Sequence, residues 1–279
     1  MRFKKKEKKL AIFFNSIRGL LVYKKISELF SVDIFIAEKN LNTKVLTFLK
    51  KKKINFTLVK RIDTDLEKKI KNENYDLLIS AGFPLIFSEE LINSSKFGTI
   101  NLHAGNLPNY RGGSPLNWQI INGQKKIGIS IVKMCKKLDA GDIYASKTFR
   151  LTKKDDIKTV HNKANLFFSK MIIDVINKIY LGIKPLPQKR IGEKTYRQRS
   201  ENDGLIDWEK LNAEEVFNFV RAITKPYPGA FYFNEKKNKI KIYNCTVSKR
   251  NPAIVPGKVF FIKKKKFIKC KNFSIRLKS

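Results

Sequence analysis

The sequence has little of what builds disulfide frameworks, metal sites or membrane spans. Only three cysteines occur in 279 residues. Cys135, Cys245 and Cys270 are odd in number and lack C-x-x-C spacing, so neither a disulfide framework nor a zinc or other metal site is suggested. The longest apolar runs, such as residues 10–14, are far shorter than the roughly 20 residues that cross a bilayer. We therefore expect a cytoplasmic protein with free thiols and no membrane partner.

Acidic residues and histidine are scarce as well. The chain has 59 Lys and Arg against 24 Asp and Glu, a formal net charge of +35, and two histidines. Such a charge can attract nucleic acid. The lysines are spread along the whole chain, however, and their clusters lack interleaved aromatic residues, so no dedicated nucleic-acid module is indicated. Of the two histidines, His161 lies in no motif and is expected to be structural, which leaves His103 as the chemical candidate.

The whole chain is 42% hydrophobic. In its first part, apolar patterns typical of strands and of helices alternate. The patterns predict strands at residues 9–14, 32–37, 56–59, 76–80, 98–103 and 127–132, and helices at 19–30, 43–51, 64–72, 89–94, 115–122 and 159–181. This alternation predicts an α/β fold, a Rossmann-like, mainly parallel sheet with helices on both faces. Ligands of such sheets bind beyond the carboxyl ends of the strands.

The composition changes after residue 182. Residues 183–202 contain two prolines and a basic polar stretch, which is typical of a linker. Beyond it, a short helix at 213–222 and short strands at 230–233, 239–243, 258–262 and 267–277 predict a small β-barrel-like, OB-type domain. We expect a catalytic domain at 1–182, a linker at 183–202 and a C-terminal β-rich domain at 203–279.

One strand and one turn supply a candidate site. Side chains two residues apart in a strand share a face, so Asn101 and His103 should point together near the ligand-binding edge. The turn at residues 138–142 offers two carboxylates. Histidine exchanges protons at neutral pH, an amide N–H stabilises an oxyanion, and a carboxylate orients or charges an imidazole. This set suits acyl transfer to an amine, although spacing alone equally allows His103 to be a simple hydrogen-bonding residue.

Three blocks of sequence carry a family resemblance. Asn101-Leu-His103, Leu107-Pro-Asn-Tyr-Arg-Gly112 and Leu138-Asp-Ala-Gly-Asp142 together resemble the N-H, L-P-x-Y-R-G and L-D-x-G-D signature of the formyltransferases that use N10-formyltetrahydrofolate. The similarity extends over about residues 76–260 and includes Arg221-Ala-Ile-Thr-Lys-Pro-Tyr-Pro-Gly-Ala230. The resemblance implies an enzyme with N10-formyltetrahydrofolate as co-substrate.

The resemblance also implies roles for individual residues. The implied catalytic residues are Asn101, His103 and Asp139; the implied cofactor-binding residues are Phe83, Pro84, Leu85, Ile86, Leu138 and Asp142; the implied substrate-binding residues are Tyr110 and Arg111. One departure is present: the family usually has Ser-Leu-Leu-Pro after the histidine, and this chain has Gly105-Asn-Leu-Pro108. The departure leaves the three catalytic residue types in place.

The acceptor is a separate question. A glycinamide ribonucleotide transformylase would have a glycine- and serine-rich phosphate loop after its first strand, unlike residues 14–19 here. The segments at 114–123 and 196–208 are more similar to nucleotide-sugar N-formyltransferases, which favours a nucleotide-linked amino sugar and a role in lipopolysaccharide or O-antigen biosynthesis. The alternatives are methionyl-tRNA formyltransferase, with initiator tRNA as nucleic-acid partner, and a non-catalytic basic RNA-binding protein on the same fold. A homodimer is left open.

Overall fold

The computed structural model describes residues 8–189 and 194–277 and contains a seven-stranded sheet of order β3-β2-β1-β4-β5-β7-β8. The strands are β1 (Lys9–Phe13), β2 (Ser31–Ala37), β3 (Thr57–Val59), β4 (Leu77–Ser80), β5 (Thr99–His103), β7 (Lys126–Lys133) and β8 (Ile143–Arg150). The pairs β3-β2, β2-β1, β1-β4 and β4-β5 are parallel, whereas β5 pairs with β7 antiparallel. The predicted mainly parallel, Rossmann-like sheet is confirmed.

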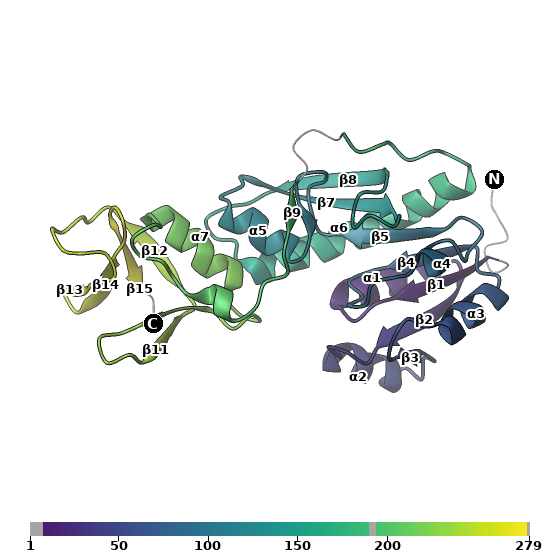
Figure 1. Cartoon of the computed structure of the whole chain (residues 1–279), viewed down its shortest axis with the longest axis horizontal. Helices are drawn as coiled ribbons and strands as arrows, with labels where there is room; N and C mark the ends of the chain where they lie inside the picture. The colour runs from purple at the N-terminus through teal and green to yellow at the C-terminus, as the bar shows by residue number, and fades with distance from the viewer. Residues whose placement is uncertain (1–7, 190–193, 278–279) are drawn as a thin grey trace. The chain divides into compact units, whose positions relative to one another are not determined.

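Helices flank this sheet (Figure 1). They are α1 (Ile17–Ile26), α2 (Thr43–Lys51), α3 (Thr64–Asn72), α4 (Glu89–Ile92) and α6 (Ile157–Tyr180). Local sequence sets several helix starts: the side chains of Asn42, Asp63 and Ser88 each accept a hydrogen bond from a backbone N–H in the first turn of α2, α3 and α4. Such N-caps satisfy donors that the helix itself leaves unpaired.

An aromatic cluster fills the core beside β1. Phe13 stacks on Phe35 with ring centroids 4.6 Å apart, and Phe87 meets Phe13 edge-on at 4.9 Å. Phe83 and Leu85, which follow β4, pack against the same cluster. The loop after β4 is therefore anchored by its own apolar side chains at the carboxyl edge of the sheet.

The second part of the fold combines two helices with small sheets. Its helices are α5 (Pro115–Ile121) and α7 (Ala213–Ile223), its antiparallel strands are β10 (Ala230–Phe233), β11 (Lys239–Ile242), β12 (Cys245–Ser248), β13 (Val259–Ile262), β14 (Lys265–Lys269) and β15 (Ser274–Leu277), and β6 (Arg111–Gly112) pairs with β9 (Thr195–Tyr196). The β-rich C-terminal region is confirmed. The single strand predicted at 267–277 is instead two strands, because the chain turns at Phe273, where φ is 50°.

The chain divides into two compact units. The first unit contains Met1–Arg111, Gly128–Thr148 and Lys163–Lys194, and the second contains Gly112–Ile127, Phe149–Asn162 and Thr195–Ser279. The domain boundaries expected from sequence stay a prediction. Within the described residues, no helix has the length and apolar content needed to span a membrane. All three cysteines are free thiols; Cys135 is exposed and the other two are buried.

Candidate active site

Two of the candidate side chains lie on strand β5, near the carboxyl edge of the sheet. Asn101 pairs in register with Ser80 of β4 on one side and with Val132 of β7 on the other, while His103, the last residue of β5, lies opposite Ser130. Their spacing of two residues places both side chains on one face of the strand. Both reach the same third residue, Asp139.

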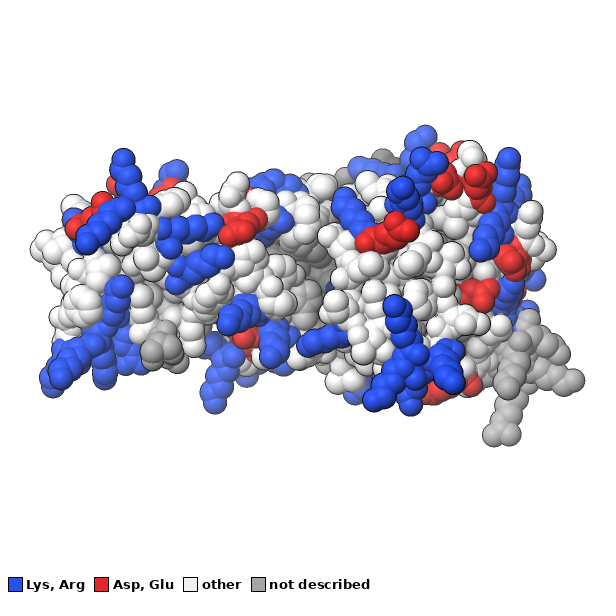
Figure 2. All heavy atoms as spheres, turned by 90° about the horizontal axis from the view of Figure 1, so that it is seen from below, with Lys and Arg blue, Asp and Glu red and all other residues white. Residues whose placement is uncertain are grey.

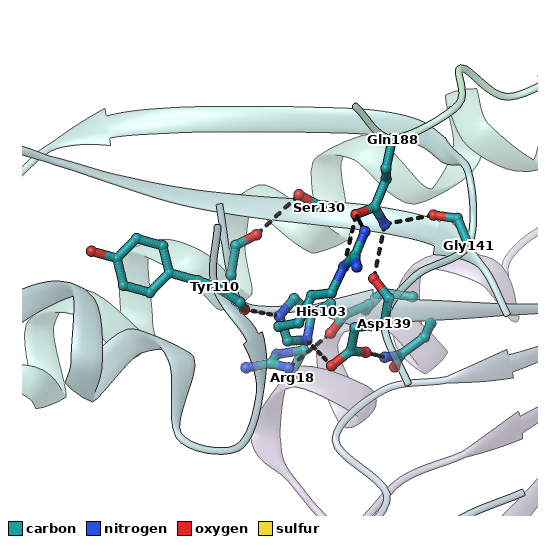
Figure 3. Close-up of polar contacts among 11 residues, drawn as sticks. Arg18, His103, Tyr110, Ser130, Asp139, Gly141 and Gln188 are labelled. Carbon is teal, nitrogen blue, oxygen red and sulfur yellow. Dashed lines mark hydrogen bonds and ion pairs between the residues drawn. The ribbon is translucent and has the colours of Figure 1, made fainter. Parts of the chain in front are cut away.

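Asp139 lies in the turn that follows β7. Its Oδ1 accepts a hydrogen bond from Asn101 Nδ2 at 3.2 Å, and its Oδ2 lies 3.3 Å from His103 Nδ1 (Figure 3). Gly141 allows this turn to lie against β7, because a Cβ there would be 1.7 Å from the carbonyl oxygen of Lys133. The backbone N–H of Lys133 also donates to the carbonyl of Asp142 at 2.8 Å. The structure thus brings Asn101, His103 and Asp139 together.

The two ring nitrogens of His103 have different surroundings. Nε2 lies 2.6 Å from the backbone carbonyl oxygen of Tyr110, and a carbonyl oxygen can only accept, so Nε2 carries a proton and donates it. In the neutral ring, Nδ1 is then the unprotonated nitrogen, and it faces the carboxylate of Asp139. The geometry therefore identifies Nδ1 as the nitrogen that can gain and lose a proton.

Burial and charge act on His103 in opposite directions. The side chain is 6% exposed, and this burial lowers its pKa by disfavouring the imidazolium. The carboxylate of Asp139 and the Tyr110 carbonyl raise the pKa, while Arg18 lowers it further. The net direction is downward, which favours a neutral ring. A neutral Nδ1 and a carboxylate oxygen at 3.3 Å then face each other with lone pairs, an arrangement that an arriving proton relieves.

The departure from the family signature has a structural counterpart. A Cβ at Gly105 would lie 2.3 Å from His103 Nε2 and 2.3 Å from the Tyr110 carbonyl oxygen, so in this chain the absent side chain makes room for their contact. The carbonyl of Gly105 accepts a hydrogen bond from the buried hydroxyl of Ser130 at 3.0 Å. Asn106 lies on Gly128 of β7, where a Cβ would meet its side chain at 2.4 Å. Ser130 and Gly128 of β7 thus contact residues 105 and 106, the two positions at which this chain departs from the family signature.

Two residues near the site were not singled out from the sequence. Arg18 of α1 donates from Nη1 to the carbonyl of Leu102 at 2.9 Å, between the two candidate residues of β5. Gln188 follows α6 and contacts both Arg111 and the turn that holds Asp139 (Figure 3). Neither residue belongs to a recognisable motif. The only sequence signal was that Arg18 follows the first strand, where ligand-binding loops of such sheets begin.

The residues expected to bind substrate are buried. Arg111 is 2% exposed and its guanidinium donates to Gln188 Oε1, while the Tyr110 ring points away from His103 (Figure 3). The contacts that the structure gives them support His103 and the Asp139 turn. Their assignment to the acceptor stays a prediction.

The expected cofactor-binding residues divide into two groups. Phe83 and Leu85 turn toward the aromatic core, and Pro84 and Asp142 are half-buried. Ile86 and Leu138 are 84% and 55% exposed. Two exposed apolar side chains thus lie in the loops after β4 and β7, and these two strands flank β5 in the sheet. An apolar ring system needs such side chains, and the assignment of all six residues stays a prediction.

Known proteins resemble this chain in sequence and fold. Family models described as formyl transferase and as formyl transferase, C-terminal domain, match residues 33–176 and 199–279. A methionyl-tRNA formyltransferase from Malacoplasma penetrans (strain HF-2) is 31% identical over 245 residues, covering 82% of this chain and 76% of the relative.

Solved structures share the fold. An N-formyltransferase from Helicobacter canadensis, in complex with folinic acid and dTDP-3-aminofucose, superposes with a TM-score of 0.73 at 18% identity and covers 97% of this chain and 99% of its own. HypX from Aquifex aeolicus in complex with tetrahydrofolic acid gives a TM-score of 0.68 at 18% identity, covering 96% of this chain. The chain spans 43% of the HypX chain.

Proposed function

Because the chain belongs to the formyltransferase family, we propose that it transfers a formyl group from N10-formyltetrahydrofolate to the primary amine of an amino-deoxy sugar carried on a nucleoside diphosphate. The chain is a formyl-transfer enzyme, and N10-formyltetrahydrofolate is the donor that the family uses. We thus propose the identity of the acceptor, the roles of the residues that act on it, and the cytoplasm as the place of reaction.

The observation that carries the acceptor assignment is a cluster of contacts within the second unit. Its two segments, residues 112–118 and 196–199, overlap the segments 114–123 and 196–208, which are more similar to nucleotide-sugar N-formyltransferases. The backbone N–H of Gly113 donates to the carbonyl of Tyr196 at 2.8 Å, and Trp118 Nε1 donates to the carbonyl of Arg197 at 3.0 Å. The Arg199 guanidinium lies 4.8 Å from the centre of the Trp118 ring. The two segments are far apart in sequence but contact each other, and they thus form one local structure.

The three polar side chains fit the donor's chemistry. When bound, the donor supplies a formyl carbon open to attack by an amine. Within the described residues, the Asn101 amide has Asp139 as its only partner, so its second N–H is available to the formyl oxygen as negative charge develops there. His103 Nδ1 takes the proton that the attacking amine releases and returns it to the departing nitrogen. Asp139 stabilises the imidazolium between these two transfers.

A second acceptor is favoured by a specific observation. The relative at 31% identity is a methionyl-tRNA formyltransferase, and a chain of net charge +35 suits a polyanionic acceptor. On the face shown in Figure 2, however, Lys and Arg are scattered among uncharged residues rather than gathered in one continuous patch. Initiator methionyl-tRNA is therefore the second candidate.

The two acceptors are separated by comparing how efficiently the protein formylates each of them. Purified protein receives N10-formyltetrahydrofolate with either dTDP- and UDP-linked amino sugars or charged initiator methionyl-tRNA, and kcat/KM is measured for each. We expect efficient formylation of at least one sugar, with a weak dependence on salt. Efficient formylation of the tRNA alone, with a steep loss between about 50 and 200 mM salt, would establish the second candidate instead.

A further inference from the structure

Gln188 connects two loops of the first unit that are far apart in sequence. Its Oε1 accepts hydrogen bonds from Arg111 Nε at 3.1 Å and Nη2 at 2.7 Å. Its Nε2 donates to the carbonyl oxygens of Asp139 at 2.8 Å and Gly141 at 2.6 Å (Figure 3). One amide side chain therefore uses both its acceptor and its donor capacity, each toward a different loop.

The loop that carries Asp139 has a backbone that needs support. Asp139 has φ of 51°, in the left-handed region, which residues other than glycine adopt mainly where their surroundings hold them. The hydrogen bonds from Gln188 fall on the carbonyl of Asp139 itself and on that of Gly141, two residues later. They thus fix the backbone from which the Asp139 carboxylate projects.

The other loop acts on the opposite side of the same imidazole. Arg111 directly follows Tyr110, whose carbonyl oxygen accepts from His103 Nε2. The guanidinium of Arg111 is buried and is held by Gln188. Through Arg111, Gln188 supports the contact at Nε2, and through the Asp139 loop it supports the contact at Nδ1.

We propose that Gln188 is a positioning residue for formyl transfer, which sets the two loops so that both nitrogens of His103 keep their partners. This inference rests on the roles proposed above for His103 and Asp139. Gln188 does not reach the reacting atoms, so its contribution is to the geometry of the groups that do. A side chain that only accepts or only donates cannot serve both loops.

The experiment compares Gln188→Ala and Gln188→Glu with Gln124→Ala, a control at an exposed glutamine. Glutamate keeps acceptors for Arg111 but places carboxylate oxygens against two carbonyls. We expect both Gln188 variants to lose about 10- to 100-fold in kcat, the cost typical of a misplaced catalytic group, with KM values near wild type. The pH profile of kcat should also move, since Asp139 and Arg18 are the charged groups that act on His103. The control should keep wild-type kinetics.

Two results would overturn the inference. One is a Gln188→Ala protein that keeps most of its kcat with an unchanged pH profile. The other is full activity in Gln188→Glu, which would mean that only the Arg111 contact matters; this variant decides the question even where Gln188→Ala fails to fold. Asp139→Asn, measured in parallel, keeps the inference distinct from the proposed function. If Asp139→Asn is impaired and the Gln188 variants are not, the inference about Gln188 alone fails, whereas an active Asp139→Asn refutes the proposed catalytic roles.

Discussion

Replacing Asp139 with asparagine tests the proposed proton transfer with little change of shape. The new amide can turn its oxygen toward Asn101 Nδ2, which now donates to Oδ1 at 3.2 Å, and its NH2 toward His103 Nδ1, which now faces Oδ2 at 3.3 Å. Both contacts survive as hydrogen bonds, and Nε2 keeps its bond to Tyr110. The substitution therefore stabilises the neutral ring and removes the charge that stabilises the imidazolium.

The size of the effect follows from what is lost. Without the carboxylate, the pKa of His103 is lowered relative to the wild type, because Asp139 raises it whereas burial and Arg18 lower it. His103 then accepts a proton poorly at the moment when the amine must release one. We expect kcat to fall by about 10²- to 10⁴-fold, the usual contribution of a general acid–base group, or about 3 to 5 kcal/mol in activation free energy.

The assay can observe the imidazole directly, because the chain has only two histidines. In ¹⁵N-labelled protein, His161, whose Nε2 lies 3.0 Å from the Tyr227 hydroxyl, provides an internal reference. The His103 signals should show the Nε2–H tautomer and, in Asp139→Asn, should stay neutral to lower pH than in the wild type. Steady-state formylation gives kcat for the same samples. Asp174→Asn, at an exposed aspartate on α6, is the matched control.

Either of two results would refute this reasoning. The first is a kcat for Asp139→Asn within about tenfold of the wild type, which is too small a loss for a group that stabilises the proton acceptor. The second is a His103 titration that does not change when the carboxylate is removed. A large fall in melting temperature is not expected, because the amide can keep hydrogen bonds to Asn101 and His103.

Two further predictions concern the apolar loop after β4 and the ion pair in the second unit. Ile86→Ser should raise KM for N10-formyltetrahydrofolate with an unchanged melting temperature, whereas Leu85→Asp should lower the melting temperature as well, because Leu85 packs against the aromatic core; equal effects on stability would contradict this division. The Arg197 side chain, with the Ser200 N–H, holds the pKa of Asp203 below its usual 3.8. The ionised Asp203 therefore stabilises the folded protein fully above pH 3.8, and this stabilisation is lost as the pH falls toward the pKa of Asp203 in the folded state. Asp203→Asn should therefore unfold at lower urea than wild type at pH 7, with a gap that narrows below pH 3.8; a constant gap would count against the ion pair.

Periodicity predicted the sheet well where strands are buried and less well at its edge. Strands β1 and β4 are almost wholly apolar, and β7 buries its six central residues, so their patterns stand out in the sequence. Strand β8 was not predicted: it lies at the edge of the sheet, its residues are exposed or half-buried, and its sequence Ile143-Tyr-Ala-Ser-Lys-Thr-Phe-Arg150 has no continuous apolar run. An edge strand owes its conformation to backbone pairing with a neighbour, which a sequence pattern does not record.

The site shows the same division between local and long-range information. The two-residue spacing of Asn101 and His103, together with the resemblance to a known signature, was enough to expect them beside Asp139. Gln188 lies in a segment whose composition is that of a linker, and its importance arises only from folding, when it meets residues 77 and 49 positions earlier in the chain. Contacts of this kind involve ordinary residue types, and no local pattern distinguishes them.

The effect of glycine at position 105 follows from the residues that surround it in the fold. In the sequence, glycine for serine is the loss of a hydroxyl beside the candidate catalytic histidine. In the structure, the missing Cβ is what lets the Tyr110 carbonyl approach His103 Nε2, and the hydroxyl of Ser130 on β7 bonds the Gly105 carbonyl from the opposite strand. The exchange therefore bears on the tautomer of His103: by admitting an acceptor at Nε2 it leaves Nδ1 as the basic nitrogen, on the side where Asp139 lies.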